Sequence, residues 1–218
     1  MTIQDNTVLI TGASKGIGLA SARVLSRRDF NIVGIARAAP DSKFPGDFFN
    51  VDLSDRKSSK QLLDKLRQDY QFSGLVNNVG ALGAELIEQV KLETVDHVYQ
   101  VNVGAAILCA QCCIPSMRVN GWGRIVNISS ELALGLPKRT AYGGAKAALI
   151  SMTRTWALEL ARNGITVNAI APGWIDTPGE RLTFSDEVIA EEGSKLPWGR
   201  LGMPSEIGTA AVFLVCRD

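Results

Sequence analysis

Hydrophobic positions along this chain follow two spacings that alternate from one end to the other. Short, unbroken apolar runs rich in Val and Ile are separated by longer stretches in which apolar residues recur at helical spacing. The short runs are typical of strands buried on both faces, and the longer stretches are typical of amphipathic helices. Because strands alternate with helices, the pattern predicts parallel strands joined by helical crossovers, which form a doubly wound α/β sheet in three layers.

The same pattern places the individual elements. Strands are expected at Thr7–Ile10, Asn31–Ala36, Phe48–Val51, Leu75–Asn77, Arg124–Ile128 and Ile165–Ile170. Helices are expected at Ile17–Arg28, Asp55–Tyr70, Val95–Met117, Ala141–Arg162 and Pro204–Phe213. Pro172 to Arg200 has no clear period, and an irregular region of this length in a compact domain is usually a functional lid or a disordered segment.

Composition and charge narrow the class of protein. The 218 residues are 46% hydrophobic, which suits one core, and we expect a single domain over residues 1–218. A net charge of +1 with no basic stripe argues against a nucleic-acid partner. No unbroken apolar run is long enough to span a membrane. Met1–Asp5 lacks the charged and apolar regions of a secretory signal, so a cytoplasmic protein is expected.

Cysteine and histidine usage argues against a metal site. Cys109, Cys112 and Cys113 fall in one apolar helical stretch, without paired zinc-ligand spacing, and His97 is the only histidine in the chain. We expect these cysteines to be reduced thiols in the core or in an interface. The single histidine also weighs against Ser-His-Asp chemistry.

The first candidate site is the segment Thr11–Gly18, which follows the first strand and opens the first helix. Its glycines, Gly12, Gly16 and Gly18, let the backbone approach a pyrophosphate, and the helix N-terminus supplies amide groups and a positive dipole. The spacing differs from the usual G-x-G-x-x-G, so an ordinary glycine-rich turn is the alternative. The strand–turn–helix context favours dinucleotide binding.

The second and third candidate sites lie around the fifth strand. Tyr142 and Lys146 are four residues apart on the following helix and therefore share one face. A lysine cation near a tyrosine favours the phenolate and lowers the pKa of the phenol, which suits proton transfer. Ser129 and Ser130 follow the strand at its carboxyl end, where open α/β sheets bind ligands. Taken alone, the Tyr-x-x-x-Lys pair could be two solvated surface residues, and the serine pair could cap a turn at the strand end.

Together these motifs give a resemblance to the short-chain dehydrogenase/reductase family, which covers essentially the whole chain. It implies a Rossmann-type fold and an enzyme that transfers hydride between a nicotinamide cofactor and a carbonyl or secondary alcohol. The matching pieces are Thr11–Gly18, Asn77-Asn78-Val79-Gly80, Asn102, Ser130, Tyr142-x-x-x-Lys146 and Pro172-Gly173.

The resemblance also implies a role for each matching residue. Tyr142 would be the acid/base, and Lys146 would lower the pKa of Tyr142 and hold the nicotinamide ribose. Ser130 would position the substrate oxygen, and Asn102 would support a water-linked proton relay. Asp52 could instead cap the following helix. The implied cofactor contacts are Gly12, Ser14, Lys15, Gly16, Ile17, Gly18, Arg37, Asp52, Leu53, Asn78, Gly80, Tyr142, Lys146, Pro172, Gly173, Ile175 and Thr177.

The chain departs from the family pattern in three places. Val79 stands where the family usually has alanine. Ser130 precedes Tyr142 by one residue fewer than usual, so Ser129 could take the role, although the register of the strand end favours Ser130. The family normally continues into a seventh strand after the point where Arg217–Asp218 ends this sequence, so that strand is expected to be missing here.

The residues after the second strand predict the cofactor. An acidic residue there would bond the adenosine ribose, whereas a basic residue accommodates a 2′-phosphate. Arg37 occupies the position, Lys15 lies on the facing turn, and Asp41 is several residues further on. A guanidinium forms forked bonds with phosphate. The sequence therefore predicts NADP(H) in preference to NAD(H).

Apolar helix faces predict self-association. Opposite Tyr142, the helix from Ala141 carries Ala147, Ser151, Thr155 and Leu158, with Arg154 and Arg162 at the flanks; the preceding helix is apolar through Ala105, Ala106, Ile107 and Leu108. A solvated face would carry more charge. Family members commonly pair through these two helices, and we expect a closed homotetramer or homodimer.

The substrate is the least defined part of the prediction. A mixed apolar wall around the site favours an apolar ketone, with a 3-oxoacyl thioester as the family's commonest theme. The alternatives are an NAD-dependent sugar or polyol dehydrogenase and a non-catalytic dinucleotide-binding regulatory protein. The expected wall residues are Leu132, Leu134, Leu136, Trp174, Leu182, Phe184 and Trp198.

Overall fold

A computed structural model describes residues 6–216 and shows one parallel sheet in the order β3-β2-β1-β4-β5-β6. The predicted doubly wound sheet is confirmed, and each predicted strand is present. The expectations for Met1–Asp5 and Arg217–Asp218 lie outside the described residues, within which the sheet has six strands. The strands are β1 (Thr7–Thr11), β2 (Asn31–Ala36), β3 (Asp47–Asn50), β4 (Phe72–Asn77), β5 (Gly123–Ile128) and β6 (Ile165–Ile170).

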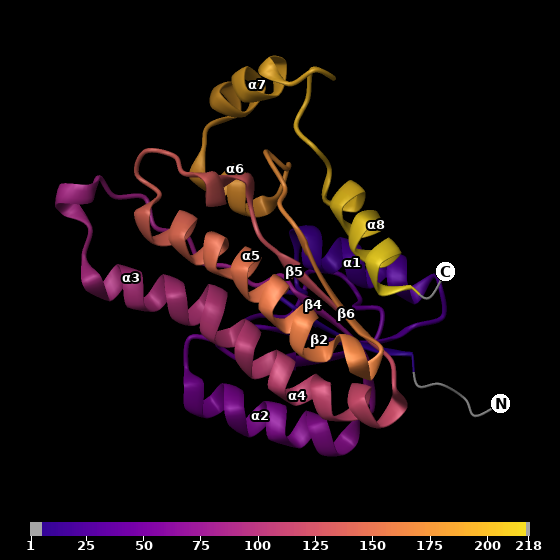
Figure 1. The fold of residues 1–218 in the computed structure, drawn as a ribbon. Helices are drawn as coiled ribbons and strands as arrows, with labels where there is room; N and C mark the ends of the chain where they lie inside the picture. Colours follow the sequence, from indigo (N-terminus) through magenta and orange to yellow (C-terminus); the bar gives the residue numbers. More distant parts are fainter. Residues whose placement is uncertain (1–5, 217–218) are drawn as a thin grey trace.

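Helices cover both faces of the sheet, as Figure 1 shows. Two helices, α1 (Gly16–Ser26) and α8 (Pro204–Val215), pack together on one face. The other face is covered by α2 (Arg56–Asp69), α4 (Ala105–Asn120) and α5 (Thr140–Leu160). Every residue of β1 and β4 is buried, as expected for central strands of a sheet that is covered on both faces.

Helix α3 (Leu92–Tyr99) runs into α4 through one turn of π-helix, Gln100–Gly104. The sequence predicts one continuous helix here, and the π turn is a difference. The Gln100 side chain packs closely against Gly104, where a Cβ would lie 2.7 Å from its Oε1. Single π turns occur often at functional sites.

The helical run Leu92–Asn120 is long and apolar enough to cross a membrane by length and average hydropathy. The sequence analysis looked for an unbroken apolar run and so expected no such candidate. Half of the most apolar window is buried inside the protein, and α4 packs against β4, β5 and α2. Cys109, Cys112 and Cys113 lie on this buried side as free thiols, as predicted. Core packing explains the apolar composition.

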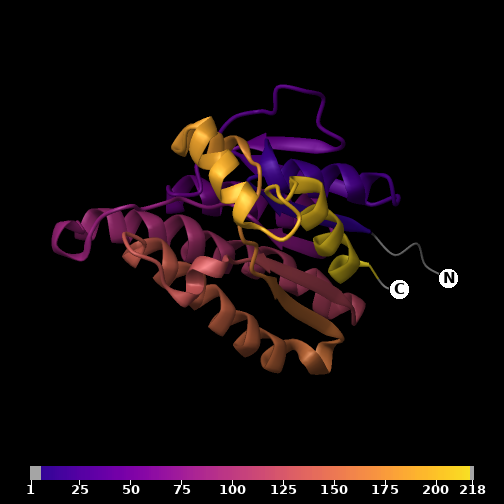
Figure 2. The ribbon, with the colours of Figure 1, turned by 90° about the horizontal axis from the view of Figure 1, so that it is seen from above.

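The region from Pro172 to Arg200 is not irregular throughout, which corrects the sequence prediction. It contains α6 (Pro178–Thr183) and α7 (Asp186–Lys195). The hydroxyl of Thr177 accepts from the backbone N–H of Glu180, and Pro178 is the first helical residue. Both helices lie beyond the ends of β4, β5 and β6 at the top of Figure 1. In Figure 2, seen from above, α7 lies in front of the sheet.

Candidate active site

The site is assembled where the strand order reverses, between β1 and β4, because the loops that follow these neighbouring strands separate there. After β1, Gly12 and Gly16 adopt positive φ values of +63° and +56°, which favour glycine. A Cβ at Gly18 would lie 2.3 Å from the carbonyl oxygen of Gly12. The loop is therefore a tight cradle that only glycines can form, and it delivers the chain to the N-terminus of α1.

Asn78, after β4, holds this cradle in place. Its Nδ2 donates to the carbonyl oxygens of Thr11 and Gly12 at 2.9 and 3.2 Å. The Thr11 hydroxyl accepts from the backbone N–H groups of Asn78 and Val79 at 2.8 and 2.9 Å. The side chain of Asn78 is thus committed to the loop itself, so its contribution to a ligand is to fix the backbone that would hold one.

Tyr142, in the first turn of α5, lies beside Ser130 at the end of β5. The Ser130 hydroxyl lies close enough to the phenol of Tyr142 to lower its pKa, and it accepts a hydrogen bond from the N–H of Leu132 at 3.2 Å. Ser129 is buried, and its hydroxyl donates instead to the carbonyl oxygen of Lys146 at 2.8 Å. The geometry therefore pairs Ser130, not Ser129, with the tyrosine.

The pKa of Tyr142 is raised above its ordinary value. Burial is the largest cause, since it disfavours the phenolate, and the Ser130 hydrogen bond and the Arg139 charge partly oppose it. The sequence predicts that Lys146 lowers this pKa, but Lys146 is not among the groups that do so in the structure. A phenol that stays protonated at neutral pH is suited to donate a proton.

Lys146 lies one helical turn after Tyr142 and is almost completely buried. Burial lowers its pKa to about 8. Its Nζ donates to the carbonyl oxygen of Ile128 at 2.8 Å and lies 5.5 Å from the centre of the Tyr142 ring. This bond turns the ammonium group toward the strand end rather than toward the phenol oxygen.

Asn102, in the π turn, presents a buried oxygen to the same space. Its Nδ2 donates to the carbonyl oxygens of Val98 and Ala81 at 2.8 and 2.9 Å, while Oδ1 has no hydrogen-bond partner among residues 6–216. A Cβ at Gly80 would lie 3.1 Å from this Oδ1 and 3.7 Å from Nζ of Lys146. Four residues predicted to be catalytic, Asn102, Ser130, Tyr142 and Lys146, are thus brought together.

A chain of buried side-chain hydrogen bonds holds α5 against the sheet. Nδ2 of Asn77 on β4 donates to Oδ1 of Asn127 on β5 at 2.9 Å. Nδ2 of Asn127 in turn donates to the Thr153 hydroxyl on α5 at 2.9 Å. Because buried polar groups are specific about their partners, this chain sets the position of α5 and therefore of Tyr142.

The predicted cation site lies at the far side of the cradle. Arg37 follows β2, Lys15 precedes α1, and both side chains are exposed. Asp52, which precedes α2, has a pKa lowered by hydrogen bonds from Ser54 and also by the charge of Arg37. The sequence analysis did not place this carboxylate near Arg37. Asp52 does not cap α2, because Asp55 does.

Leu53 beside Asp52 is buried, and its carbonyl oxygen accepts from Nε2 of Gln100 at 3.5 Å. This bond joins the start of α2 to the π turn. Of the remaining positions in the loop before α1, Ser14 and Ile17 are half-buried.

The segment that follows β6 contacts both the residues after β5 and the glycine loop. The carbonyl oxygen of Pro172 accepts from the N–H of Glu131 at 2.9 Å, and a Cβ at Gly173 would lie 3.0 Å from Oε2 of Glu131. Ile175 is buried and pairs with Gly202. The methyl group of Thr177 would lie 3.5 Å from a Cβ at Gly16, so this segment meets the glycine loop.

Two residues near the phenol were missed by the sequence analysis. Arg139 lowers the pKa of Tyr142 and Glu180 raises it, so both charges face the site. Arg139 precedes α5 by one residue and could have been noticed by its distance from Tyr142. Glu180 had a local signal, because Thr177-x-x-Glu180 is a capping-box pattern that marks a helix start.

The expected apolar substrate wall is only partly formed. Trp174 and Phe184 pack together with ring centres 5.1 Å apart. Leu134, Leu182 and Trp198 are instead 92%, 82% and 68% exposed, so they enclose no pocket in this structure.

The residues fit a dinucleotide by two independent features. The glycine cradle has room only for backbone, which lets a pyrophosphate approach the amides at the start of α1. The buried Oδ1 of Asn102 lacks a donor, as expected for a group that bonds a bound molecule or water. Among the described residues no group of acidic, cysteine or histidine side chains could hold a metal ion.

Known proteins resemble this chain along its whole length. The family profile described as enoyl-(acyl carrier protein) reductase matches residues 12–218. The 3-oxoacyl-[acyl-carrier-protein] reductase of Thermotoga maritima is 35% identical over 100% of this chain and 93% of its own length. The corresponding Escherichia coli reductase is 31% identical over 100% and 93%.

A solved structure from Beutenbergia cavernae agrees in fold. This protein, provisionally described as an NAD(P) dependent gluconate 5-dehydrogenase, was crystallised with NADP at low occupancy. Its TM-score to this chain is 0.87 at 31% identity, with 96% of this chain and 88% of the other covered.

Proposed function

Since the chain belongs to the short-chain dehydrogenase/reductase family of oxidoreductases, we propose that it reduces a ketone to a secondary alcohol with NADPH and uses Tyr142 as the proton donor. The observation that supports this most is the placement of the half-buried Tyr142 phenol beside the Ser130 hydroxyl, with the buried Lys146 one helical turn away. Two hydroxyl groups that converge on one point fit a substrate oxygen.

The proposed roles follow from the positions of the side chains. NADPH would supply the hydride when bound in the glycine cradle. The Ser130 hydroxyl binds the carbonyl oxygen, and the Tyr142 phenol donates its proton to that oxygen as the alcohol forms. Lys146, whose Nζ lies 5.5 Å from the centre of the Tyr142 ring, holds the nicotinamide ribose. Oδ1 of Asn102 accepts a hydrogen bond from the water that returns a proton toward Lys146.

We propose that Arg37 and Lys15 bind the 2′-phosphate of NADPH. Both side chains are exposed at the rim of the cradle, and neither has an ion-pair partner in the part of the chain that the structure describes. The proposed cofactor contacts are those implied by the sequence, namely Gly12, Ser14, Lys15, Gly16, Ile17, Gly18, Arg37, Asp52, Leu53, Asn78, Gly80, Tyr142, Lys146, Pro172, Gly173, Ile175 and Thr177.

The substrate class that we propose is a 3-oxoacyl thioester or a related ketone, and the protein is proposed to act in the cytoplasm. The names of the bacterial reductases with 35% and 31% identity support this class. The test is NADPH oxidation, followed at 340 nm as is usual for this cofactor, with 3-oxoacyl thioesters and a panel of unrelated ketones. Detection of the secondary alcohol supports the proposal, and NADPH binding without reduction of any carbonyl contradicts it.

We further propose that α4 and α5 form the surface of a closed homotetramer or homodimer. The exposed large apolar residues on these two helices are Ile107, Val119, Ile150 and Leu158. Ala105 and Ala106, which the sequence analysis placed on this surface, are buried against the rest of the protein, because α4 turns that side toward the sheet. A hollow of about 740 Å³ adjoins the surface and is lined in part by Tyr99, Val103 and Ile107.

Light scattering at micromolar concentration is expected to give the mass of a dimer or tetramer. Leu158→Arg should shift that mass toward the monomer, since it places a charge where 74% of the leucine side chain is now exposed and available for burial in a partner. Leu92→Arg, at an equally exposed leucine on α3, is the matched control and should leave the mass unchanged. A monomeric wild-type protein would contradict the proposal.

A further inference from the structure

Two opposite charges face Tyr142 and have no part in the proton transfer described above. Arg139 immediately precedes α5, and Glu180 lies on α6, so they reach the phenol from two different elements. Each changes the pKa of Tyr142, Arg139 downward and Glu180 upward, which places both charges within electrostatic range of the reacting group.

The guanidinium of Arg139 is anchored but has unused hydrogen-bonding capacity. Its backbone carbonyl accepts from the N–H of Gly143 at 2.7 Å, which fixes it to α5. Nη1 donates to the carbonyl oxygen of Gly83 at 3.4 Å, at the long end for a hydrogen bond. Nε is buried and has no partner within residues 6–216. A buried donor without an acceptor is costly, so an acceptor from a bound molecule would be favourable here.

The carboxylate of Glu180 is also uncommitted. It is half-buried and makes no hydrogen bond or ion pair with a described residue; burial raises its pKa, and the charge of Arg139 opposes this shift. Glu180 and Arg139 therefore interact electrostatically without forming a direct ion pair.

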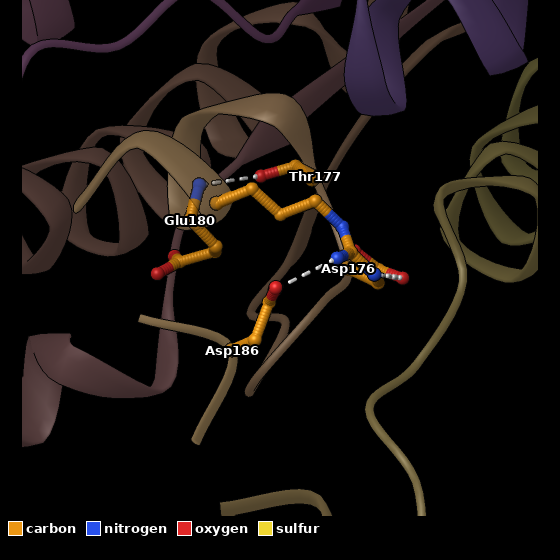
Figure 3. A network of polar contacts seen from close by, with 5 residues as sticks. Asp176, Thr177, Glu180 and Asp186 are labelled. Carbon is orange, nitrogen blue, oxygen red and sulfur yellow. Dashed lines mark hydrogen bonds and ion pairs between the residues drawn. The ribbon is translucent and has the colours of Figure 1, made fainter. Parts of the chain in front are cut away.

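Helix α6 is held so that Glu180 keeps this direction. Arg181 binds both carboxylate oxygens of Asp176 at 2.6 and 2.7 Å and reaches Asp186 at 3.4 Å. Figure 3 shows that the carboxylate of Glu180 points away from Asp176, while the Thr177 hydroxyl caps the helix. Because Asp176 and Asp186 bind Arg181, the carboxylate of Glu180 is not drawn into an ion pair with Arg181.

A group that accepts a hydrogen bond from Arg139 also lies within range of the negative charge of Glu180. A neutral carbonyl oxygen gains the charged hydrogen bond and meets little repulsion. A free carboxylate would gain the same bond but would also be repelled by Glu180 in a partly buried site, where charges interact strongly. Arg139 is the residue before α5 and Tyr142 lies in its first turn, so a substrate whose ketone oxygen meets Tyr142 can extend a second carbonyl group toward Arg139.

We propose that Arg139 is a specificity-determining residue that binds the ester or thioester carbonyl oxygen of a 3-oxo substrate, and that Glu180 discriminates against the free 3-oxo acid. This inference rests on the proposed ketone reduction and specifies its substrate. A ketone without the second carbonyl makes no use of Arg139. The proposed pair therefore distinguishes a 3-oxoacyl group from a simple ketone and from its own hydrolysis product.

The test compares three ketones, ethyl acetoacetate, acetoacetate and 2-pentanone, in four variants and the wild type. For each variant the kcat/KM is divided by the wild-type value for the same ketone, so that intrinsic reactivity cancels. Arg139→Gln should lower kcat/KM for ethyl acetoacetate about ten- to hundred-fold, as expected for one charged hydrogen bond. It should leave 2-pentanone within about two-fold. Glu180→Gln should raise kcat/KM for acetoacetate alone.

Matched controls are available next to each residue. Lys138→Gln removes an exposed charge beside Arg139, and Glu187→Gln removes one from α7; neither should change any ratio. An equal loss for all three ketones in Arg139→Gln would show a structural role and overturn the proposal. Unchanged discrimination between ester and acid in Glu180→Gln would overturn its second half.

A binding measurement separates this proposal from the proposed reaction. The Tyr142→Phe protein loaded with NADPH is titrated with ethyl acetoacetate by calorimetry, with and without Arg139→Gln. A weaker affinity in the double variant supports the role of Arg139 even if turnover is never observed. Equal affinities overturn that role even if ketones are reduced.

Discussion

Replacing Tyr142 with phenylalanine is expected to lower kcat for ketone reduction by at least about a hundred-fold and up to about ten-thousand-fold, the range that general acid catalysis supplies. The ring remains and continues to pack against the apolar cluster of Val98, Ala141 and Ala145. Only the hydroxyl that bonds Ser130 is lost. Steady-state kinetics should therefore show a change in kcat, while fluorescence titration shows that NADPH still binds.

The chain offers a control with the same chemical change. The Tyr70 hydroxyl donates to Asp47 at 2.8 Å, and Tyr70 lies at the C-terminal end of α2, where its ring contacts Phe49 and Phe72. Tyr70→Phe should cost about 0.5–1.5 kcal/mol of unfolding free energy through this lost hydrogen bond and should leave kcat unchanged. Turnover near the wild-type rate in folded Tyr142→Phe protein would show that another group donates the proton.

The second large effect is expected at the cofactor. Arg37→Asp should reduce the preference for NADPH over NADH or reverse it, since it replaces a guanidinium with a carboxylate that repels the 2′-phosphate. Loss of a charged hydrogen bond costs about 1.5–3 kcal/mol, which corresponds to about ten- to hundred-fold in affinity. Because Arg37 also lowers the pKa of Asp52, the variant adds a second carboxylate beside an existing one, and the effect on NADPH should lie at the upper end.

Kinetics with both cofactors would test this prediction. The ratio of kcat/KM for NADPH to that for NADH is compared between wild type and variant. Lys91→Asp, an exposed position at the start of α3, makes the same change of charge away from the cradle and should leave the ratio unaltered. A wild-type protein that favours NADH would show that Arg37 and Lys15 hold no phosphate.

Much of this fold could be predicted from the sequence because it depends on local patterns. Each strand is a short apolar run, and the helices have apolar faces, so periodicity alone located β1 to β6 and most helices. The glycine loop was also readable, because positive φ at Gly12 and Gly16 is a local requirement that other residues meet poorly. Spacing along α5 placed Tyr142 and Lys146 on one face. The single domain over residues 1–218 stays a prediction.

Tertiary structure alone decided which polar groups meet. The sequence does not distinguish Ser129 from Ser130. In the folded protein the Ser129 hydroxyl donates to the backbone carbonyl of Lys146, whereas Ser130 lies beside Tyr142. The π turn that presents Asn102 interrupts an otherwise regular helix, and within it the Gln100 side chain packs against Gly104. Neither outcome has a periodic signal.

The charges around the site depend on tertiary structure for the same reason. Arg139 and Glu180 are 41 positions apart, and Arg37 and Asp52 are 15 apart, yet each pair interacts electrostatically once the loops at the carboxyl edge of the sheet fold together. Burial, which dominates the pKa of Tyr142 and of Lys146, is likewise a property of the packed chain. The sequence by itself determined the architecture and the family of this protein. Only the folded structure placed the charges that tune its chemistry, because electrostatic energies depend on distance and burial rather than on order along the chain.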